Sequence, residues 1–258
     1  MRAGGPIPAV ARPPQGLRPG SCAFFLDLDG TLLELAPHPD AVRVDTPLLD
    51  LLRALAQRSD GALALISGRS IATLDTLLQP LQLPASGLHG FERRNAAGVC
   101  VRRDPPNPWT LEQARRLLRE LVAKEPRLVI EDKGIALALH YRQVPQIETE
   151  AVSAVTAIAN HVRGGLRVQR GRMVIELAPG AVTKATAIAE FMSEEPFKGR
   201  VPVCVGDDCT DEPAFEWVNA AGGISVAVSV SHPTSARTQL GSVGEVRDWL
   251  RALLGASE

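Results

Sequence analysis

The stretch FFLDLDGTL, residues 24–32, places two carboxylates directly after an apolar run. Ionised side chains at the end of a buried strand cost free energy unless a partner compensates their charge. One interpretation is a turn, because Asp29-Gly30 is a dipeptide typical of hairpins. The other is a site that binds a cation and uses Asp27 and Asp29 in a reaction. The rest of the chain has to distinguish the two.

Apolar runs and helical patterns alternate around this stretch. The run at 22–29 is followed by helical spacing over 46–59, a second buried run over 61–68 and a second helical pattern over 70–81. Near the C-terminal end the same alternation returns and finishes with a predicted helix over 243–255. This rhythm predicts an α/β fold, in which helices cover both faces of a parallel sheet.

The rhythm changes in the middle of the chain. The segment DPPNP (104–108) is a breaker, and residues 105–176 follow the order helix, two strands, helix, two strands. The strand pairs are predicted hairpins that turn near Lys133-Gly134 and near Arg170-Gly171. An α+β module therefore interrupts the α/β pattern. The predicted division is a disordered leader (1–20), a core (21–103 and 178–258) and the inserted module (104–177).

Composition limits the classes of partner. A net charge of −1 over 258 residues gives no bulk attraction to nucleic acid or to an anionic membrane. The aromatic content of 4% argues against a base-stacking surface. No apolar run reaches the roughly 18 residues of a membrane span. The four cysteines lack metal-ligand spacing, which predicts reduced thiols and a cytoplasmic location. We expect a monomer that acts on a small molecule.

Residues 1–20 are rich in Pro and Gly and lack the apolar run of a signal peptide. Such a composition cannot bury enough apolar surface to order itself, which predicts a disordered leader.

Four polar segments are candidates for chemistry. Three of them follow predicted strands: 27–31, Ser67-Gly68-Arg69 and 206–212; the fourth is Lys184, near the start of a helix. Ligands of open α/β sheets bind at the carboxyl ends of the strands, so we expect the three segments to meet there. Each alone is explained by a turn, a cap, a solvated lysine or an acidic loop. Their order along the chain favours one shared site.

Together these groups fit phosphoryl transfer. Carboxylates at Asp27, Asp29 and Asp207 are hard ligands that suit Mg²⁺, and a cation offsets their repulsion of a phosphate. The Ser67 hydroxyl can bind a phosphate oxygen, and Lys184 can stabilise transition-state charge. An aspartate nucleophile divides the reaction into two steps through an aspartyl-phosphate. The second carboxylate can then protonate the leaving oxygen and activate water.

This constellation resembles the haloacid dehalogenase (HAD) superfamily of phosphatases over residues 24 to about 254. The motifs that carry the resemblance are DLDGT (27–31), the Ser of ISGR, Lys184 and GDDCTDE (206–212). It implies a HAD-like Rossmannoid core with a parallel sheet, and an inserted αββαββ cap of the C2B type.

The resemblance also implies roles for the acidic residues. Asp27 is the expected nucleophile and Asp29 the expected general acid/base. Mg²⁺ is expected on the Asp27 side chain, the Asp29 main-chain carbonyl and the Asp207 side chain. Asp208 and Asp211 are expected to support that site.

Several stretches resemble the trehalose-6-phosphate phosphatase family. They are SGR (67–69), GLHGFERR (87–94), EDKGIALALHYR (131–142), VIELAPGAVTK (174–184) and GDDCTDE (206–212). The resemblance implies Mg²⁺-dependent hydrolysis of trehalose 6-phosphate, the last step of trehalose biosynthesis, under a cap that closes over the substrate. It implies a set of substrate-binding residues: Arg69, His89, Gly90, Glu131, Lys133, His140, Arg142 and Glu176.

Strand periodicity bears on the sugar site. Alternation places Glu131 and Lys133 on one face of their strand, and His140 and Arg142 on one face of theirs. Whether the two pairs share a face depends on the hairpin register, which the sequence leaves open. From the residues alone, the simpler interpretation is that these four side chains lie on the solvent-exposed face of an antiparallel sheet. With the resemblance, we expect sugar recognition, because charged groups in an enclosed site reject ligands that leave them unpaired.

The sequence departs from the family pattern at two positions, and two other functions remain as alternatives. Ala185 stands where the family often has Gly, and Cys209 lies within the acidic loop as a bystander. One alternative is another sugar-phosphate phosphatase, acting on sucrose phosphate or a mannosyl phosphate. The other is a non-catalytic regulator that binds a phosphosugar.

Overall fold

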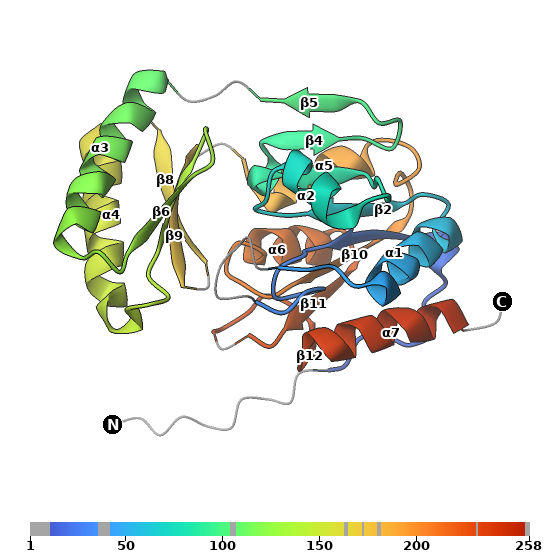
Figure 1. Cartoon of the computed structure of the whole chain (residues 1–258). Helices are drawn as coiled ribbons and strands as arrows, with labels where there is room; N and C mark the ends of the chain where they lie inside the picture. Colours follow the sequence, from blue (N-terminus) through green and yellow to red (C-terminus); the bar gives the residue numbers. More distant parts are fainter. Residues whose placement is uncertain are drawn as a thin grey trace.

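Two β-sheets with separate helical layers make up the chain (Figure 1). The computed structural model describes residues 11–35, 42–103, 107–162, 165–171, 173–179, 182–230 and 232–255. The strands of the larger sheet are β1 (Cys22–Leu26), β2 (Leu63–Ile66), β3 (Ala85–Gly87), β4 (Glu92–Arg94), β5 (Cys100–Arg102), β10 (Val201–Gly206), β11 (Ile224–Val228) and β12 (Thr238–Leu240). Those of the smaller sheet are β6 (Val129–Asp132), β7 (Leu137–His140), β8 (Leu166–Gly171) and β9 (Val174–Pro179).

The larger sheet has the strand order β12-β11-β10-β1-β2-β3-β4-β5. Its strands run parallel from β12 to β3, which confirms the predicted α/β fold with a parallel sheet. β4 and β5 add an antiparallel hairpin at one edge, which the sequence pattern did not predict. These two strands are only three residues long, too short for alternation to be recognised.

Helices cover both faces of the larger sheet, as predicted. They are α1 (Thr46–Arg58), α2 (Ile71–Leu78), α5 (Lys184–Met192), α6 (Glu212–Ala220) and α7 (Val243–Gly255). Successive side chains of a strand point to opposite faces. Phe24 and Leu26 of β1 therefore pack with α1, α2 and α7, whereas Ala23 and Phe25 pack with α5 and α6. Every residue of β1 is buried, which explains why its run reads as continuously apolar.

The order of the central strands places the polar segments. β10, β1 and β2 are neighbours, and they end directly before Asp207, Asp27 and Ser67. Because the three strands are parallel, their carboxyl ends lie at the same edge of the sheet. The predicted meeting of the three segments is therefore a consequence of strand order.

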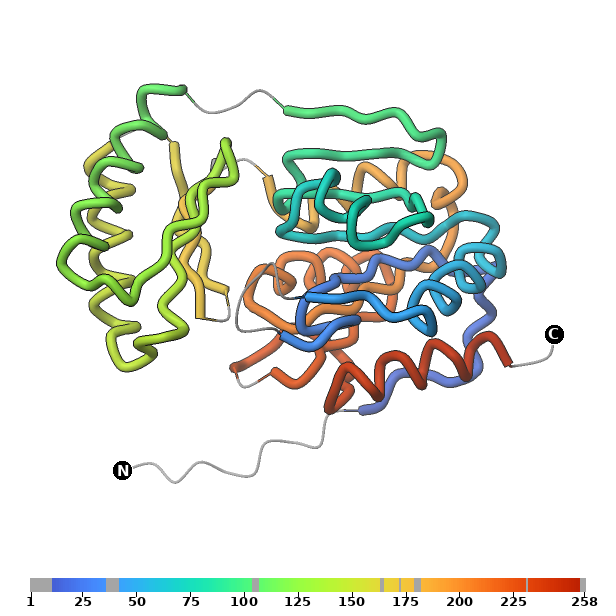
Figure 2. Tube along the Cα trace, in the orientation of Figure 1, coloured from blue at the N-terminus to red at the C-terminus, as the bar shows by residue number. Residues whose placement is uncertain are grey.

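The inserted residues form the smaller sheet and two further helices, α3 (Pro108–Lys124) and α4 (Glu148–Val162). The trace leaves the larger sheet after β5 and returns to it at α5 (Figure 2). The four strands pair antiparallel in the order β6-β7-β9-β8, and α3 and α4 bury one face of them. The element order matches the predicted αββαββ pattern.

The register of this smaller sheet answers the question of which residues share a face. Val129 pairs with His140, and Glu131 pairs with Ala138, which in turn pairs with Glu176. Residues directly opposite each other point the same way, so Glu131, His140 and Glu176 lie on one face. The second hairpin differs from the prediction: it turns between Gly171 and Val174, which pair with each other, and not at Arg170-Gly171.

The predicted disordered leader is wrong for residues 11–20. Ala11 bridges to Thr238 at the edge of the larger sheet, and the Trp249 indole Nε1 donates to the carbonyl oxygen of Pro14 at 2.9 Å. A Pro-rich segment has few donors of its own, but its carbonyls accept from a sheet edge and an indole. Residues 1–10 lie outside the described residues, as do 104–106 and 180–181 beside the predicted module borders. Within the described ranges, every helix is too short or too polar to cross a membrane.

Candidate active site

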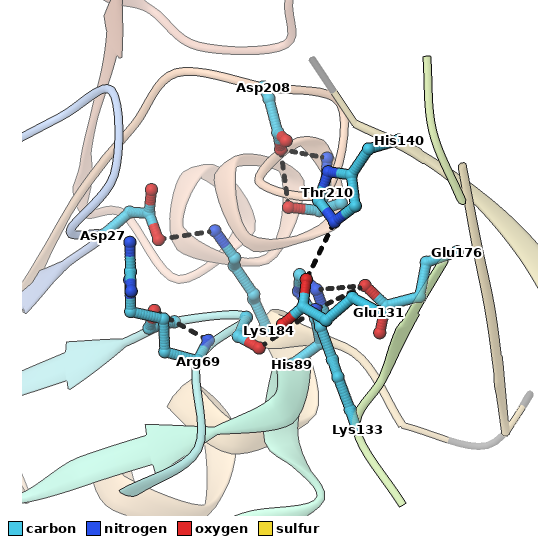
Figure 3. Close-up of polar contacts among 12 residues, drawn as sticks. Asp27, Arg69, His89, Glu131, Lys133, His140, Glu176, Lys184, Asp208 and Thr210 are labelled. Atoms are coloured by element: carbon cyan, nitrogen blue, oxygen red, sulfur yellow. Dashed lines mark hydrogen bonds and ion pairs between the residues drawn. The ribbon is translucent and has the colours of Figure 1, made fainter. Parts of the chain in front are cut away.

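A buried cluster of three carboxylates and one lysine lies at the carboxyl edge of the larger sheet. Carboxylate oxygens of Asp27, Asp207 and Asp211 all lie within 4.8 Å of one another. Lys184 Nζ is 3.0 Å from Asp27 Oδ1 (Figure 3). The same nitrogen is 2.7 Å from Asp211 Oδ1. Lys184 is the first residue of α5, so the start of this helix supplies a cation to the end of β1.

One lysine does not compensate three buried carboxylates. Burial raises the pKa of Asp27 to about 8, with Lys184 opposing the shift and Asp211 adding to it. Burial, followed by repulsion from Asp27, raises the pKa of Asp207 to about 9. Ionised carboxylates this close together need a further positive charge. The donor set is made of hard oxygens, so these groups fit Mg²⁺.

Gly30 is required for this approach of the carboxylates. It has a φ of +85°, a conformation that residues with a side chain rarely adopt. A Cβ at Gly30 would lie 2.0 Å from Asp207 Oδ2. The glycine of the DLDGT motif therefore lets the acidic loop reach the end of β1.

Asp208 and Asp211, the two aspartates expected to support the metal site, make different contacts. Asp211 precedes α6, but its carboxylate accepts from Lys184 and from the main-chain nitrogen of Asp208, at 3.3 Å for the latter. Asp208 Oδ1 accepts from the Thr210 main-chain nitrogen at 2.7 Å and from Thr210 Oγ1 at 2.5 Å (Figure 3). Asp211 is thus part of the charged cluster, whereas Asp208 holds the shape of the loop around it.

The side chain of Asp29 is engaged by Arg69. Arg69 Nε donates to Asp29 Oδ2 at 2.6 Å, and Nη2 donates to Oδ1 at 2.7 Å. Although burial lowers the pKa of Arg69, the Asp29 carboxylate raises it by more, so the net shift is upward. Ser67 is buried beside this pair, and its Oγ accepts from the Arg69 main-chain nitrogen at 3.1 Å. The loop after β2 therefore meets the loop after β1 through side chains.

A cavity of about 770 Å³ joins this edge to the smaller sheet. From the core it is lined by Asp27, Asp29, Ser67, Arg69, Lys184 and Asp207, with Asp208 and His89 beside them. From the inserted module it is lined by Glu131, Lys133, His140, Arg142 and Glu176. The structure thus brings together residues that the sequence spreads over 180 positions between Asp27 and Asp207.

Hydrogen bonds and an ion pair cover the module's side of the cavity. His140 Nε2 lies 2.8 Å from Glu131 Oε2, and Lys133 Nζ donates to Glu176 Oε2 at 3.0 Å (Figure 3). His89 Nε2, from the core, lies 3.2 Å from the same Glu176 oxygen. The hydrogen bond from His140 lowers the pKa of Glu131. Burial would raise the pKa of Glu176, but Lys133 and His89 lower it overall. Both carboxylates are therefore anionic acceptors at neutral pH.

Gly90 differs from the prediction. It is absent from the described residues that line the cavity. Its φ is +111°, and a Cβ there would lie 2.6 Å from a Val182 methyl and 3.0 Å from the Thr183 carbonyl oxygen. Gly90 therefore lets the loop after β3 pack against the segment leading into α5.

Sequence reasoning missed some of the lining. Arg127, Val129, Gln143 and Thr210 also face the cavity. Period-two alternation from Glu131 would have found Val129, whereas Arg127 lies in the turn before β6. Gln143 follows the end of β7, and no local pattern marks it.

Comparison with known proteins shows the family to which the chain belongs. The trehalose-phosphatase family matches residues 25–243. Trehalose-6-phosphate phosphatase of Escherichia coli K12 is 43% identical over 234 residues, covering 91% of this chain and 87% of that protein. A probable trehalose-phosphate phosphatase of Sinorhizobium fredii is 38% identical over 237 residues, covering 91% and 86%.

Solved structures share the fold. The C-terminal domain of Candida albicans trehalose-6-phosphate phosphatase superposes with a TM-score of 0.84 at 24% identity, covering 96% of this chain and 99% of that one. A phosphatase of the HAD superfamily from Bacteroides thetaiotaomicron superposes with a TM-score of 0.57 at 19% identity, covering 88% and 91%. By sequence match along most of its length, and with the HAD fold, the chain belongs to the trehalose-phosphatase family.

Proposed function

We propose that this protein is a phosphoric monoester hydrolase that converts trehalose 6-phosphate to trehalose and phosphate, the last step of trehalose biosynthesis. The observation that carries the proposal is one cavity with the carboxylate–lysine cluster on one wall and the charged face of the smaller sheet on the other. The 43% identical E. coli relative bears the name of this activity. The reaction is proposed to depend on Mg²⁺.

The residues of the cluster suit a two-step reaction. Asp27 attacks phosphorus and forms an aspartyl-phosphate, while Lys184, 3.0 Å away, stabilises the charge of the transferred group. Asp29 gives a proton to the leaving sugar oxygen and later takes one from the attacking water. The Ser67 hydroxyl binds a phosphate oxygen.

A metal ion fits beside the same groups. We assign Mg²⁺ to the side chains of Asp27 and Asp207 and the main-chain carbonyl of Asp29, with Asp208 and Asp211 in support. When bound, the ion supplies positive charge that neutralises the phosphate and the clustered carboxylates. The upward pKa shifts of Asp27 and Asp207 are what a site built for an added cation shows without it.

The inserted module (104–177) acts as a cap domain in this proposal, and residues 21–103 and 178–258 act as the catalytic core. Glu131, Lys133, His140, Arg142 and Glu176 present charged donors and acceptors on one rigid face of the module. Such groups suit the hydroxyls of a disaccharide, because a ligand without matching hydroxyls leaves them unpaired. From the core, Arg69 and His89 face the same cavity. The cytoplasmic location and the monomeric state stay predictions.

A substrate panel tests the proposal. Phosphate release is measured with MgCl2 from trehalose 6-phosphate, sucrose phosphate, a mannosyl phosphate and glucose 6-phosphate. We expect kcat/KM to be highest for trehalose 6-phosphate. A preference for sucrose phosphate or the mannosyl phosphate would replace the substrate but keep the reaction. Binding of trehalose 6-phosphate without turnover of any ester would instead identify a phosphosugar-binding regulator.

A further inference from the structure

The strongest unassigned feature of the cavity is the contact between Arg69 and Asp29. Two hydrogen bonds of 2.6 and 2.7 Å join the guanidinium edge to both carboxylate oxygens. The side chains are only 14% and 27% exposed, so water screens the pair little. A planar guanidinium held by two parallel bonds sets the plane of a carboxylate as well as its distance.

Arg69 is itself held in place through its main chain. Its nitrogen donates to Ser67 Oγ at 3.1 Å, and its carbonyl oxygen accepts from the Leu88 nitrogen at 3.0 Å. A Cβ at Gly87 would lie 2.8 Å from that carbonyl oxygen, so the neighbouring strand end fits closely around it. The guanidinium therefore extends from a fixed anchor.

The inserted module reaches the same loop. Lys133 Nζ donates to the carbonyl oxygen of Gly68, the residue before Arg69, at 3.2 Å. The anchor of Arg69 is thus contacted from the side of the cavity where the sugar is proposed to bind.

We propose that Arg69 is a positioning residue that orients the carboxylate of Asp29 toward the leaving sugar oxygen, and that it is not primarily a ligand of the phosphoryl group. This inference rests on the proposed phosphatase reaction. As the Asp27–phosphorus bond forms and the phosphorus–oxygen bond to the sugar breaks, the proton of Asp29 passes to the sugar oxygen. In the second step a water proton passes to Asp29 as the water oxygen bonds to phosphorus and the Asp27–phosphorus bond breaks. Arg69 keeps its own protons throughout.

A phosphate ligand would have to give up both bonds to Asp29, or share its guanidinium between two anions. A positioning residue keeps its contact with Asp29 during the reaction, and the transferred proton sits on a carboxyl lone pair that does not face the guanidinium. The two roles differ in what a substitution does: loss of positioning lowers kcat, whereas loss of a phosphate ligand weakens the binding of substrate and of free phosphate.

A double-mutant cycle separates the two roles. Arg69→Met, Asp29→Asn and the double variant are assayed with trehalose 6-phosphate and MgCl2, and inhibition by inorganic phosphate is measured for each. General acid–base catalysis contributes about 10²–10⁴-fold, so we expect Arg69→Met to lower kcat by about 10- to 100-fold. KM and the phosphate inhibition constant are expected to stay within about 2-fold, because no ligand of the phosphate is lost. In the Asp29→Asn background, the same change is expected to cost less than about 2-fold.

Arg69→Lys tests the geometry of the contact. It keeps the charge but lacks the planar fork, so we expect it to lose nearly as much kcat as Arg69→Met. A Lys variant with wild-type kcat would overturn the positioning role. Arg53→Met, which removes an exposed charge from α1, is the matched control for expression and folding, followed by thermal melting.

A burst experiment gives a readout that does not depend on the residual activity of Asp29→Asn. With 4-nitrophenyl phosphate the leaving group needs no proton, so Arg69→Met is expected to release one equivalent of nitrophenol per enzyme at the wild-type rate. Its steady state is expected to be slow, because the second step still needs Asp29. A slowed burst, or a raised phosphate inhibition constant in both backgrounds, would overturn the inference. If the wild-type protein has no phosphatase activity, the proposed function and the inference both fail. If the wild type is active but the effects of Arg69→Met and Asp29→Asn on kcat simply multiply in the double variant, only the role of Arg69 fails.

Discussion

Replacement of Lys184 by methionine is the perturbation to which this structure should respond most strongly. Lys184 is 3% exposed, and its ammonium lies between Asp27 and Asp211, themselves nearly fully buried. Methionine keeps most of the apolar stem, so the packing of α5 changes little. What is lost is the cation that favours the ionised forms of Asp27 and Asp211, so these buried carboxyls must either stay charged without that partner or take up a proton.

The magnitude follows from burial. Removing one partner of a buried ion pair costs about 3–5 kcal/mol, because the remaining charge is left uncompensated. We therefore expect Lys184→Met to lose about 3–5 kcal/mol of unfolding free energy without Mg²⁺ at neutral pH. Part of the loss should return with MgCl2, since an ion that binds only the folded state adds stability. Turnover should be abolished in either case.

The pH dependence has a definite sign. The folded-state pKa of Asp27 is about 8, above the 3.8 of an ordinary aspartate. Between these values the folded state binds more protons than the unfolded state, so metal-free stability falls as pH rises from about 4 to about 8. Removing Lys184 raises the pKa of Asp27 further, so the variant continues to lose stability at pH values where the wild-type carboxyl is already ionised. The loss caused by Lys184→Met should therefore grow as the pH rises above about 8.

The assay is urea denaturation followed by circular dichroism at several pH values, with EDTA and with MgCl2. Lys198→Met, which removes an exposed lysine, is the matched control. A loss below about 1 kcal/mol at neutral pH with EDTA, equal to that of the control, would mean that Lys184 does not compensate buried charge.

Three further predictions concern the reaction. Asp27→Asn is nearly isosteric, so the protein should fold while phosphate release disappears; substantial residual turnover would refute the nucleophile assignment. Glu131→Ala should lower kcat/KM for trehalose 6-phosphate by at least about 10-fold, the cost of one charged hydrogen bond, and 4-nitrophenyl phosphate much less; equal losses would make Glu131 structural. Gly30→Ala should cost about 1–2 kcal/mol from its positive φ alone and weaken Mg²⁺ binding, measured by calorimetry, because the new Cβ displaces Asp207; unchanged affinity would contradict the proposed ligand.

The sequence predicted those parts that local pattern encodes. Each residue of β1 is buried on both faces, and such strands read as unbroken apolar runs, so β1, β2 and β10 were recognisable together with the polar residues that follow them. Helix starts were also readable where a cap is local, as at Ser70, whose Oγ accepts from the Thr73 nitrogen. Family resemblance added roles for residues whose neighbours lie far away in the chain.

Other features depend on contacts between residues that are far apart in the sequence, and no local sequence pattern indicates such contacts. The face shared by Glu131 and His140 follows from hairpin register, and a shift of one residue would have separated them. Ala11 and Pro14 are held by Thr238 and Trp249, which lie more than 200 positions away in the sequence. Gly90 is a packing residue because of Val182 and Thr183, which sequence alone does not place beside it.

By itself the sequence determined the strand-end positions of the reactive carboxylates, because buried runs and the residues after them are local properties. Only the tertiary structure decided how those carboxylates are held. Three contacts join segments that are far apart in the sequence: Asp29 with Arg69, Asp207 with Gly30, and Lys184 at the start of α5 with Asp27 and Asp211. Such contacts form because parallel strands align their carboxyl ends, and their geometry is set by the packing of the whole sheet.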